Sequence, residues 1–276
     1  MTDAAASQPA TAPDAAAARP VAGVFRVRPL KAARALRRLI ADKEDTAQVF
    51  EVMRALNGRA TPKGYARLLS TAEGGRIAFE RPELAELLSD RAYLAGLPEG
   101  SVGAAYRAFM AAEDLSAQGL VDVSTQGAGA VFQSPHPYAW YSRRIRDAHD
   151  VWHVLTGYGR DALGEGCVVA FSHAQTRSTG FGVIALAAAA KLSREAPGHP
   201  FLAAVHEAWR TGRRCAWLPA QDYPALLAEP LGAARVRLGI PRPHVYLSIP
   251  PEARDGRSAR TADATAPAAA PLRAAA

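Results

Sequence analysis

The sequence has few cysteines and no long apolar run. Its two cysteines, Cys167 and Cys215, lie far apart in the chain, so they do not form a disulfide framework, and a reducing compartment is the simpler expectation. The longest apolar run begins at Val183 and ends at Ala190, far short of the ~20 residues that a membrane-spanning helix needs. The sequence therefore predicts neither a disulfide-rich secreted protein nor a membrane-spanning one.

Targeting signals are also lacking at the amino terminus. The first residues contain neither the basic segment nor the apolar segment of a secretory signal. Asp3 and Asp14 precede the first arginine, Arg19, which argues against a mitochondrial presequence. We therefore expect a cytoplasmic protein of bacterial type.

Motifs for nucleic-acid binding are absent although the chain is basic. The net charge is +7 and the isoelectric point is near 9.7. No helix-turn-helix, zinc finger or aromatic RNA-binding motif accompanies this charge, so we expect no nucleic-acid partner. An anionic membrane surface, or merely a preference for arginine over lysine, remains as an explanation of the basic balance.

Composition divides the chain of 276 residues into one domain and two tails. Residues 1–24 and 251–276 are rich in alanine and proline and cannot bury a core, so we expect both tails to be disordered. Between them, residues 25–250 show helical periodicity nearly throughout, and we predict a mostly α, single-domain multi-helix bundle. The best candidates for short strands are residues 119–123 and 244–249.

Several helix boundaries can be predicted from caps and periodicity. Asp45 or Thr46 begins one helix and Ser101 caps another, which buries Tyr106, Phe109 and Met110. Further helices are expected around residues 84–88, through the small residues 182–186, from about 200 to 211, and in two short segments ending near 238. Pro137 begins the helix that carries the most informative motif.

That motif consists of His149, Asp150, His153 and Glu165. On an α-helix the two histidines lie one turn apart, and Asp150 falls within the same arc of roughly 100°. Gly157 and Gly159 then break the helix and Asp161 can cap the next one, so a tight helical hairpin would return Glu165 to the histidines. We predict that these four residues bind a metal.

The ligand types indicate a catalytic metal. Imidazole and carboxylate ligands suit Zn²⁺, our default, and equally suit Fe²⁺, Mn²⁺ or Co²⁺. Without thiolates the site does not resemble closed structural zinc sites, so a position remains for water or substrate. Asp150 can bind the metal directly or orient an imidazole, and the sequence leaves both possibilities open.

Other polar residues are weaker candidates. Arg143, Arg144 and Arg146 lie on the metal-binding helix and could meet a substrate carboxylate, but a solvated helix face explains at least two of them equally well. His173, two turns after Glu165, could face the same cavity. The other histidines have no potential metal ligand at a suitable separation in the sequence, and we interpret them as ordinary residues: His136, His199, His206 and His244.

The segment HDVWHVLTGYGRDALGE resembles the H-D-x-x-H-x(11)-E signature of the coenzyme Q (ubiquinone) biosynthesis protein 4 family. Three further stretches are similar to the same family: residues 39–46 running into VFEVMRALNG, LPEGSVGAAYRAFM, and PLGAARVRLGI. The resemblance covers roughly residues 28 to 245 and leaves out both alanine-rich tails.

This resemblance implies a catalytic role for the four motif residues in ubiquinone synthesis. The expected activity is that of a carbon–carbon lyase of the 4-hydroxy-3-methoxy-5-polyprenylbenzoate decarboxylase type, acting at ring carbon 1 with or without coupled hydroxylation. The polyprenylated substrate implies isoprenoid binding and a position on the inner face of the cell membrane, peripheral to it. Other ubiquinone-biosynthesis enzymes and a second copy of the chain, in a homodimer, are the expected protein partners.

Two other functions remain open at this stage. A non-catalytic lipid-binding scaffold could organise ubiquinone-biosynthesis enzymes around a structural metal. An HD-type phosphohydrolase would use the His149–Asp150 pair, but that class needs ligands on more distant helices, and Glu165 fits it poorly.

Overall fold

The computed structural model describes residues 26–41, 45–112 and 134–256. Within these ranges the chain is helical and forms no strand, only an isolated antiparallel bridge between Ser101 and Pro230. The α-helices and one 3-10 helix, η3, are α1 (Pro29–Ala41), α2 (Thr46–Leu56), α3 (Ala60–Leu68), α4 (Ala72–Glu80), α5 (Leu84–Ser89), α6 (Arg91–Ala95), α7 (Val102–Ala112), α9 (Pro137–Asp147), α10 (His149–Thr156), α11 (Ala162–Thr176), α12 (Thr179–Glu195), α13 (Phe201–Arg214), η3 (Leu218–Ala220), α14 (Tyr223–Ala228), α15 (Leu231–Leu238), α16 (His244–Ser248) and α17 (Pro251–Arg254). The predicted mostly α, single-domain fold is confirmed.

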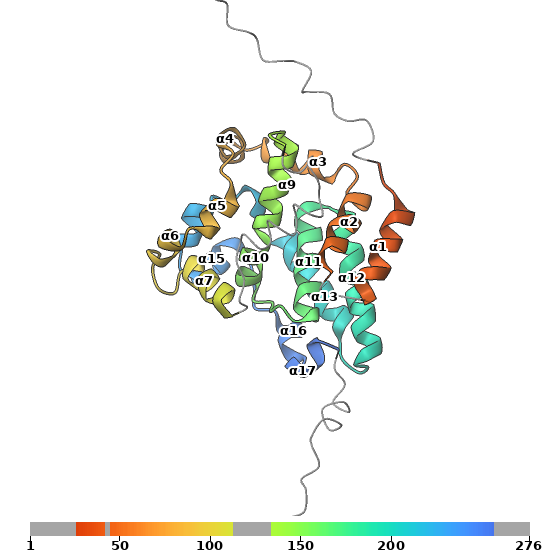
Figure 1. The fold of residues 1–276 in the computed structure, drawn as a ribbon. Coiled ribbons are helices and arrows are strands. Elements are labelled where there is room, and N and C mark those ends of the chain that lie inside the picture. Colours follow the sequence, from red (N-terminus) through yellow and green to blue (C-terminus); the bar gives the residue numbers. More distant parts are fainter. Residues whose placement is uncertain (1–25, 42–44, 113–133, 257–276) are drawn as a thin grey trace, which may run out of the picture.

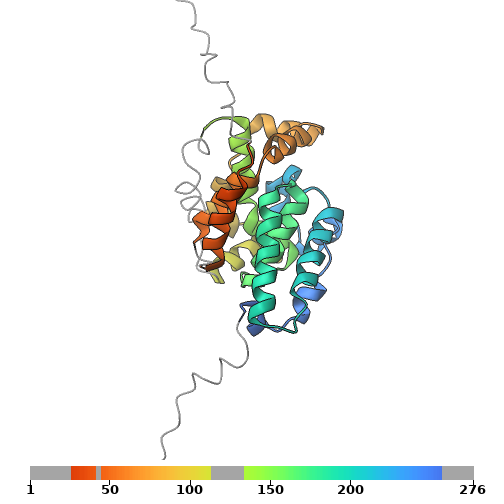
Figure 2. The same cartoon turned by 90° about the vertical axis from the view of Figure 1, so that its right-hand side faces the viewer.

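Helix α11 is the centre of the bundle. Almost all of its residues are buried, including Leu163, Val168 and Phe171, because α12 and α13 pack along it. Helix α10 lies on the other side of α11, and α7 packs against α10 (Figure 1). Helices α1 and α2 run together at one edge and contact α12 (Figure 2). The hairpin of α10 and α11 is therefore enclosed by several other helices.

The helix boundaries follow the caps expected from the sequence. The Ser101 hydroxyl accepts a hydrogen bond from the Ala104 amide, and α7 begins at the next residue. Pro137 is the first residue of α9. The carboxylate of Asp161 accepts from the Gly164 amide at 2.8 Å and caps α11. Each cap satisfies an amide that has no partner within its own helix.

Two of the sequence-based expectations are wrong. Residues 244–248 form the short helix α16 instead of a strand, because Pro243 precedes the segment and Pro250 follows it, and proline cannot donate to a strand ladder. The boundary at residue 250 is also too early. Helix α17 follows it, with Ala253 buried and the Arg254 guanidinium 4.3 Å from the ring of Tyr246. The strand candidate at 119–123, the predicted tail at 1–24 and residues 257–276 of the predicted tail at 251–276 lie outside the described residues.

Two segments far apart in the sequence meet at the bridge. The Val102 amide donates to the Glu229 carbonyl at 2.9 Å, and the Leu231 amide donates to the Gly100 carbonyl at 2.9 Å. This pair of hydrogen bonds joins the start of α7 to the start of α15. As a result, α7 is held beside α10, with which it packs.

The turn between α10 and α11 requires glycine at position 164. A Cβ atom there would lie 2.0 Å from the Gly159 carbonyl oxygen, which is backbone and cannot move aside cheaply. We expect Gly164→Ala to lower the free energy of unfolding by about 2 kcal/mol or more, as overpacking does elsewhere. Urea titration followed by circular dichroism measures this change.

Gly75 provides the matched control. It also lies in a helix, α4, but a Cβ atom there meets nothing within 4 Å. Gly75→Ala should therefore raise the free energy of unfolding by up to about 1 kcal/mol, because alanine is the better helix former. Equal effects of the two substitutions would contradict the described path of the turn.

Candidate metal centre

A left-handed glycine and an aspartate cap bring the two halves of the motif together. Helix α10 ends at Gly157, whose φ of 78° is a conformation that favours glycine. The chain then turns through Gly159 and re-enters a helix at Asp161, so that Glu165 lies in the first turn of α11. Sequence and structure agree on this helical hairpin.

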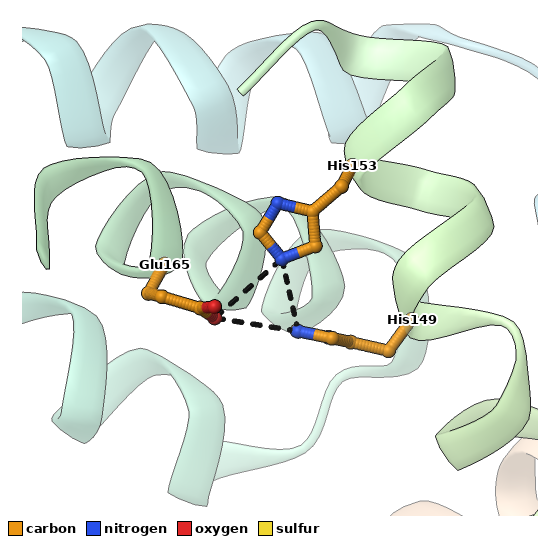
Figure 3. A group of neighbouring side chains, drawn as sticks. All are labelled: His149, His153 and Glu165. Carbon is orange, nitrogen blue, oxygen red and sulfur yellow. Dashed lines mark hydrogen bonds and ion pairs between the residues drawn. The ribbon is translucent and has the colours of Figure 1, made fainter. Parts of the chain in front are cut away.

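The side chains of His149, His153 and Glu165 converge on one point (Figure 3). The Nε2 atoms of the two histidines are 3.2 Å apart. The Glu165 Oε2 atom lies 3.4 Å from His149 Nε2 and 3.5 Å from His153 Nε2. These three groups therefore form a cluster of one carboxylate and two imidazoles that could hold a metal ion.

The spacing of the three atoms fits a tetrahedral ion. Ligand atoms that sit about 2.0 Å from a tetrahedral metal are about 3.3 Å from one another. The observed separations of 3.2, 3.4 and 3.5 Å are close to this value. Three ligand atoms form one face of such a tetrahedron, which leaves the fourth position for another group.

His153 is the most tightly held member of the cluster. Its side chain is fully buried, and its ring stacks on that of Phe109 from α7, with the centroids 5.4 Å apart. Its Nδ1 atom lies 3.1 Å from the Tyr158 carbonyl oxygen, which can only accept, so Nδ1 carries the hydrogen of this bond. In the neutral ring Nε2 then presents its lone pair to the cluster, as a metal ligand must.

The Glu165 carboxylate and the His153 imidazole of the cluster stabilise each other's charged forms. Burial by itself raises the pKa of Glu165, but the adjacent His153 and His149 outweigh it and hold that pKa well below the usual range. Burial lowers the pKa of His153, while Glu165 and, more weakly, Asp150 raise it above its ordinary value. The Arg160 guanidinium lies 3.5 Å from Glu165 Oε1, on the oxygen that does not face the histidines. Glu165 is thus kept ionised.

Asp150 lies outside this group of three. It is buried beside the cluster, and its charge acts on His153 and on Tyr106 of α7, whose pKa is raised first by burial and then by Asp150 and Asp147. Of the four residues predicted to bind metal, the structure brings three together within 4.8 Å. A direct bond from Asp150 to the metal stays a prediction.

The three arginines of α9 neither form a solvated face nor point into the cluster as free cations. Arg144 is buried and donates to the carbonyls of Pro219 and Gln221. Arg143 pairs with Glu83 at 2.5 Å. Arg146 is buried against Asp147. All three are structural, because each guanidinium has partners within the protein.

His173 is likewise directed elsewhere. Its Nδ1 atom lies 2.8 Å from the Ser178 carbonyl, at the opposite end of α11 from Glu165. The remaining histidines are not part of the cluster. Cys167 is buried, whereas Cys215 is only partly buried and its sulfur accepts a hydrogen bond from Gln175.

The sequence interpretation missed the residues that support the cluster. Phe109 was expected on a buried face but not against His153, and Tyr158 and Arg160 were not singled out. Arg235 of α15 donates to the carbonyls of Leu155 and Val154 in the last turn of α10, where the helix offers no amide four residues on. The signal in the sequence for this contact is that Arg235 lies within PLGAARVRLGI, a stretch that resembles the family.

The chain is similar to known proteins of one family. Residues 30–244 match the family described as Coenzyme Q (ubiquinone) biosynthesis protein Coq4. The ubiquinone biosynthesis protein COQ4 homolog, mitochondrial, of Rattus norvegicus is 30% identical over 175 residues, which are 63% of each chain. The mitochondrial COQ4 protein of Podospora anserina is 28% identical over 180 residues, 64% of this chain and 56% of the relative. The matched region thus spans less than two thirds of these relatives.

A solved structure shows the same fold. A crystal structure of a protein from Nostoc punctiforme PCC 73102, assigned to ubiquinone biosynthesis, superposes with a TM-score of 0.56 at 22% sequence identity. The superposition covers 78% of this chain and 99% of the other. The family match over residues 30–244 covers more than half of the chain and includes the whole motif. The chain belongs to the Coenzyme Q (ubiquinone) biosynthesis protein Coq4 family.

Proposed function

We propose that this protein acts in ubiquinone biosynthesis and removes the carboxylate at ring carbon 1 of a polyprenylated 4-hydroxybenzoate intermediate. The observation that carries this proposal is the convergence of His149, His153 and Glu165 on one point, with separations of 3.2 to 3.5 Å. Membership of the family supports the place in ubiquinone biosynthesis. The chemistry is our inference from the ligand types.

His149, His153 and Glu165 would hold a divalent metal, with Zn²⁺ as the default and Fe²⁺, Mn²⁺ or Co²⁺ as alternatives. When bound, the metal supplies positive charge that stabilises negative charge developing on the substrate. Decarboxylation breaks the bond between ring carbon 1 and the carboxylate, releases carbon dioxide, and leaves the ring carbon to take up a proton. A hydroxylating version would also need dioxygen as co-reactant.

The chain's own residues determine where the substrate approaches. His153 is fully buried, whereas the side chains of His149 and Glu165 are 22% and 36% exposed. The substrate therefore enters from the side of His149 and Glu165, while Phe109 closes the other side of the His153 ring. Within the described part of the chain, Arg160 is the arginine that contacts the cluster, through Glu165.

The substrate's prenyl tail requires contact with a bilayer. No helix within the described residues is long and apolar enough to cross a membrane. We therefore propose peripheral attachment to a membrane surface, where a polyprenylated substrate is available. Association with other ubiquinone-biosynthesis enzymes and with a second copy of this chain belongs to the same proposal.

The metal ligands can be tested one at a time. His149→Ala, His153→Ala and Glu165→Gln should each reduce bound metal from about one ion per chain to less than a tenth of that, because each removes one of three ligands. Elemental analysis of protein purified without chelators measures the metal. His206→Ala is the control, since His206 is exposed and stacks only on Trp209.

The same variants test the function in cells that lack their own homologue. We expect loss of ubiquinone with each ligand variant and normal ubiquinone with His206→Ala. Full metal content in all three ligand variants would contradict the metal site. Folded, metal-free variants that restore ubiquinone fully would contradict catalysis and favour the alternative, a lipid-binding scaffold with a structural metal.

Asp150 has a separate test. Asp150→Asn keeps the shape of the side chain and removes its charge, which acts on His153. If Asp150 orients or polarises the ligands, metal stays bound and turnover of a prenylated hydroxybenzoate falls about 10- to 100-fold. Loss of the metal itself would instead assign Asp150 as a fourth ligand. Unchanged metal content and turnover would show that Asp150 has no role in the site.

A further inference from the structure

The outer face of α1 carries a row of cations beside a surface groove. Lys31, Arg34 and Arg38 lie on one stripe of the helix, at spacings of three and four residues. With Gln48 and Glu51 of α2 they line a groove of about 450 Å³ between the two helices. The groove therefore presents three positively charged side chains to one space.

Only part of this positive charge is balanced within the described residues. Among the described residues that line the groove, Glu51 is the acidic one, and its carboxylate binds Lys31 at 2.7 Å and also contacts Arg54. Arg34 and Arg38 form no ion pair with another described residue. A groove with two guanidinium groups that have no ion-pair partner among the described residues is complementary to an anion such as a phosphate.

The same face exposes apolar side chains that a soluble anion would not need. Leu30 is 77% exposed and Val27, just before the helix, is 52% exposed. Leu30 and Arg37 fall within roughly 120° of arc together with the three cations of the groove. The opposite face of α1 is already used, because Ala32 is buried there and Leu36 and Leu39 pack against the core. The outer face is thus both basic and partly apolar.

We propose that the groove between α1 and α2 binds the phosphate groups of anionic phospholipids and docks the protein on a bilayer, with Leu30 and Val27 entering the headgroup boundary. Cations surrounding exposed aliphatic side chains are the pattern of helices that lie in a membrane interface. Nucleic acid or an acidic protein would match the charge but would leave Leu30 in a polar environment. The inference rests on the proposed membrane attachment and on no step of the metal chemistry.

Vesicle co-sedimentation of the full chain tests this proposal. The variant Arg34→Gln/Arg37→Gln/Arg38→Gln removes three cations of the face and keeps the side chains long. Each cation near an anionic surface contributes on the order of fivefold to binding, so the triple variant should bind phosphatidylglycerol vesicles about a hundredfold more weakly at low salt. As the salt concentration rises, vesicle binding by the unmodified protein should fall toward that of the variant.

Matched controls separate this face from net charge. Arg210→Gln/Arg214→Gln/Arg242→Gln removes three exposed arginines from α13 and the segment before α16, and should leave vesicle binding within about twofold. Leu30→Ser should weaken binding about tenfold, since it removes most of the apolar contribution of a leucine. Leu202→Ser, at a position 55% exposed on α13, should have no effect.

The outcomes distinguish this inference from the proposed function. Equal losses of vesicle binding in the two triple variants would contradict docking through the α1 groove and would attribute the binding to the overall positive charge. Binding of single-stranded RNA that is lost in the α1 variant, with vesicle binding retained, would overturn the lipid as occupant. No vesicle binding by the unmodified protein, with metal and ubiquinone production intact, would remove the membrane contact and leave the metal centre standing.

Discussion

The hydrogen bond between His153 and the Tyr158 carbonyl is the constraint on which the site depends. It joins the His153 ring on α10 to the backbone of the turn that follows, at 3.1 Å, and fixes which ring nitrogen faces the cluster. The same turn also determines the position of Glu165, because Asp161, at its end, caps α11 four residues before Glu165. The orientation of the His153 imidazole is therefore coupled to the geometry of the hairpin, because one hydrogen bond joins the ring to the turn.

The core of the candidate site could be predicted from sequence because it is local. Helical periodicity places His149 above His153, and Gly157 and Asp161 carry turn and cap preferences that do not depend on the rest of the fold. The helix boundaries near Ser101 and Pro137 were predictable for the same reason. Local rules succeed where local hydrogen bonds decide the conformation.

Long-range contacts could not be predicted in this way. The stacking of Phe109 on His153 depends on how α7 packs against α10, and a periodic pattern gives the buried face of a helix but not its neighbour. The partners of Arg143, Arg144 and Arg146 come from distant segments for the same reason. The segment at 244–248 has strand-like composition, and only its flanking prolines and the contact of Tyr246 with Asp161 favour a helix.

The bridge between Ser101 and Pro230 has a consequence for the order in which the protein assembles. His149 and Glu165 are joined by a short turn, so their encounter closes a small loop, whereas the bridge closes a loop that contains the whole hairpin. During synthesis the ligands emerge from the ribosome well before Pro230 does. The hairpin of α10 and α11 is therefore complete in sequence while α15 and Arg235, which donates to the end of α10, are still absent, and these enclosing contacts are added afterwards.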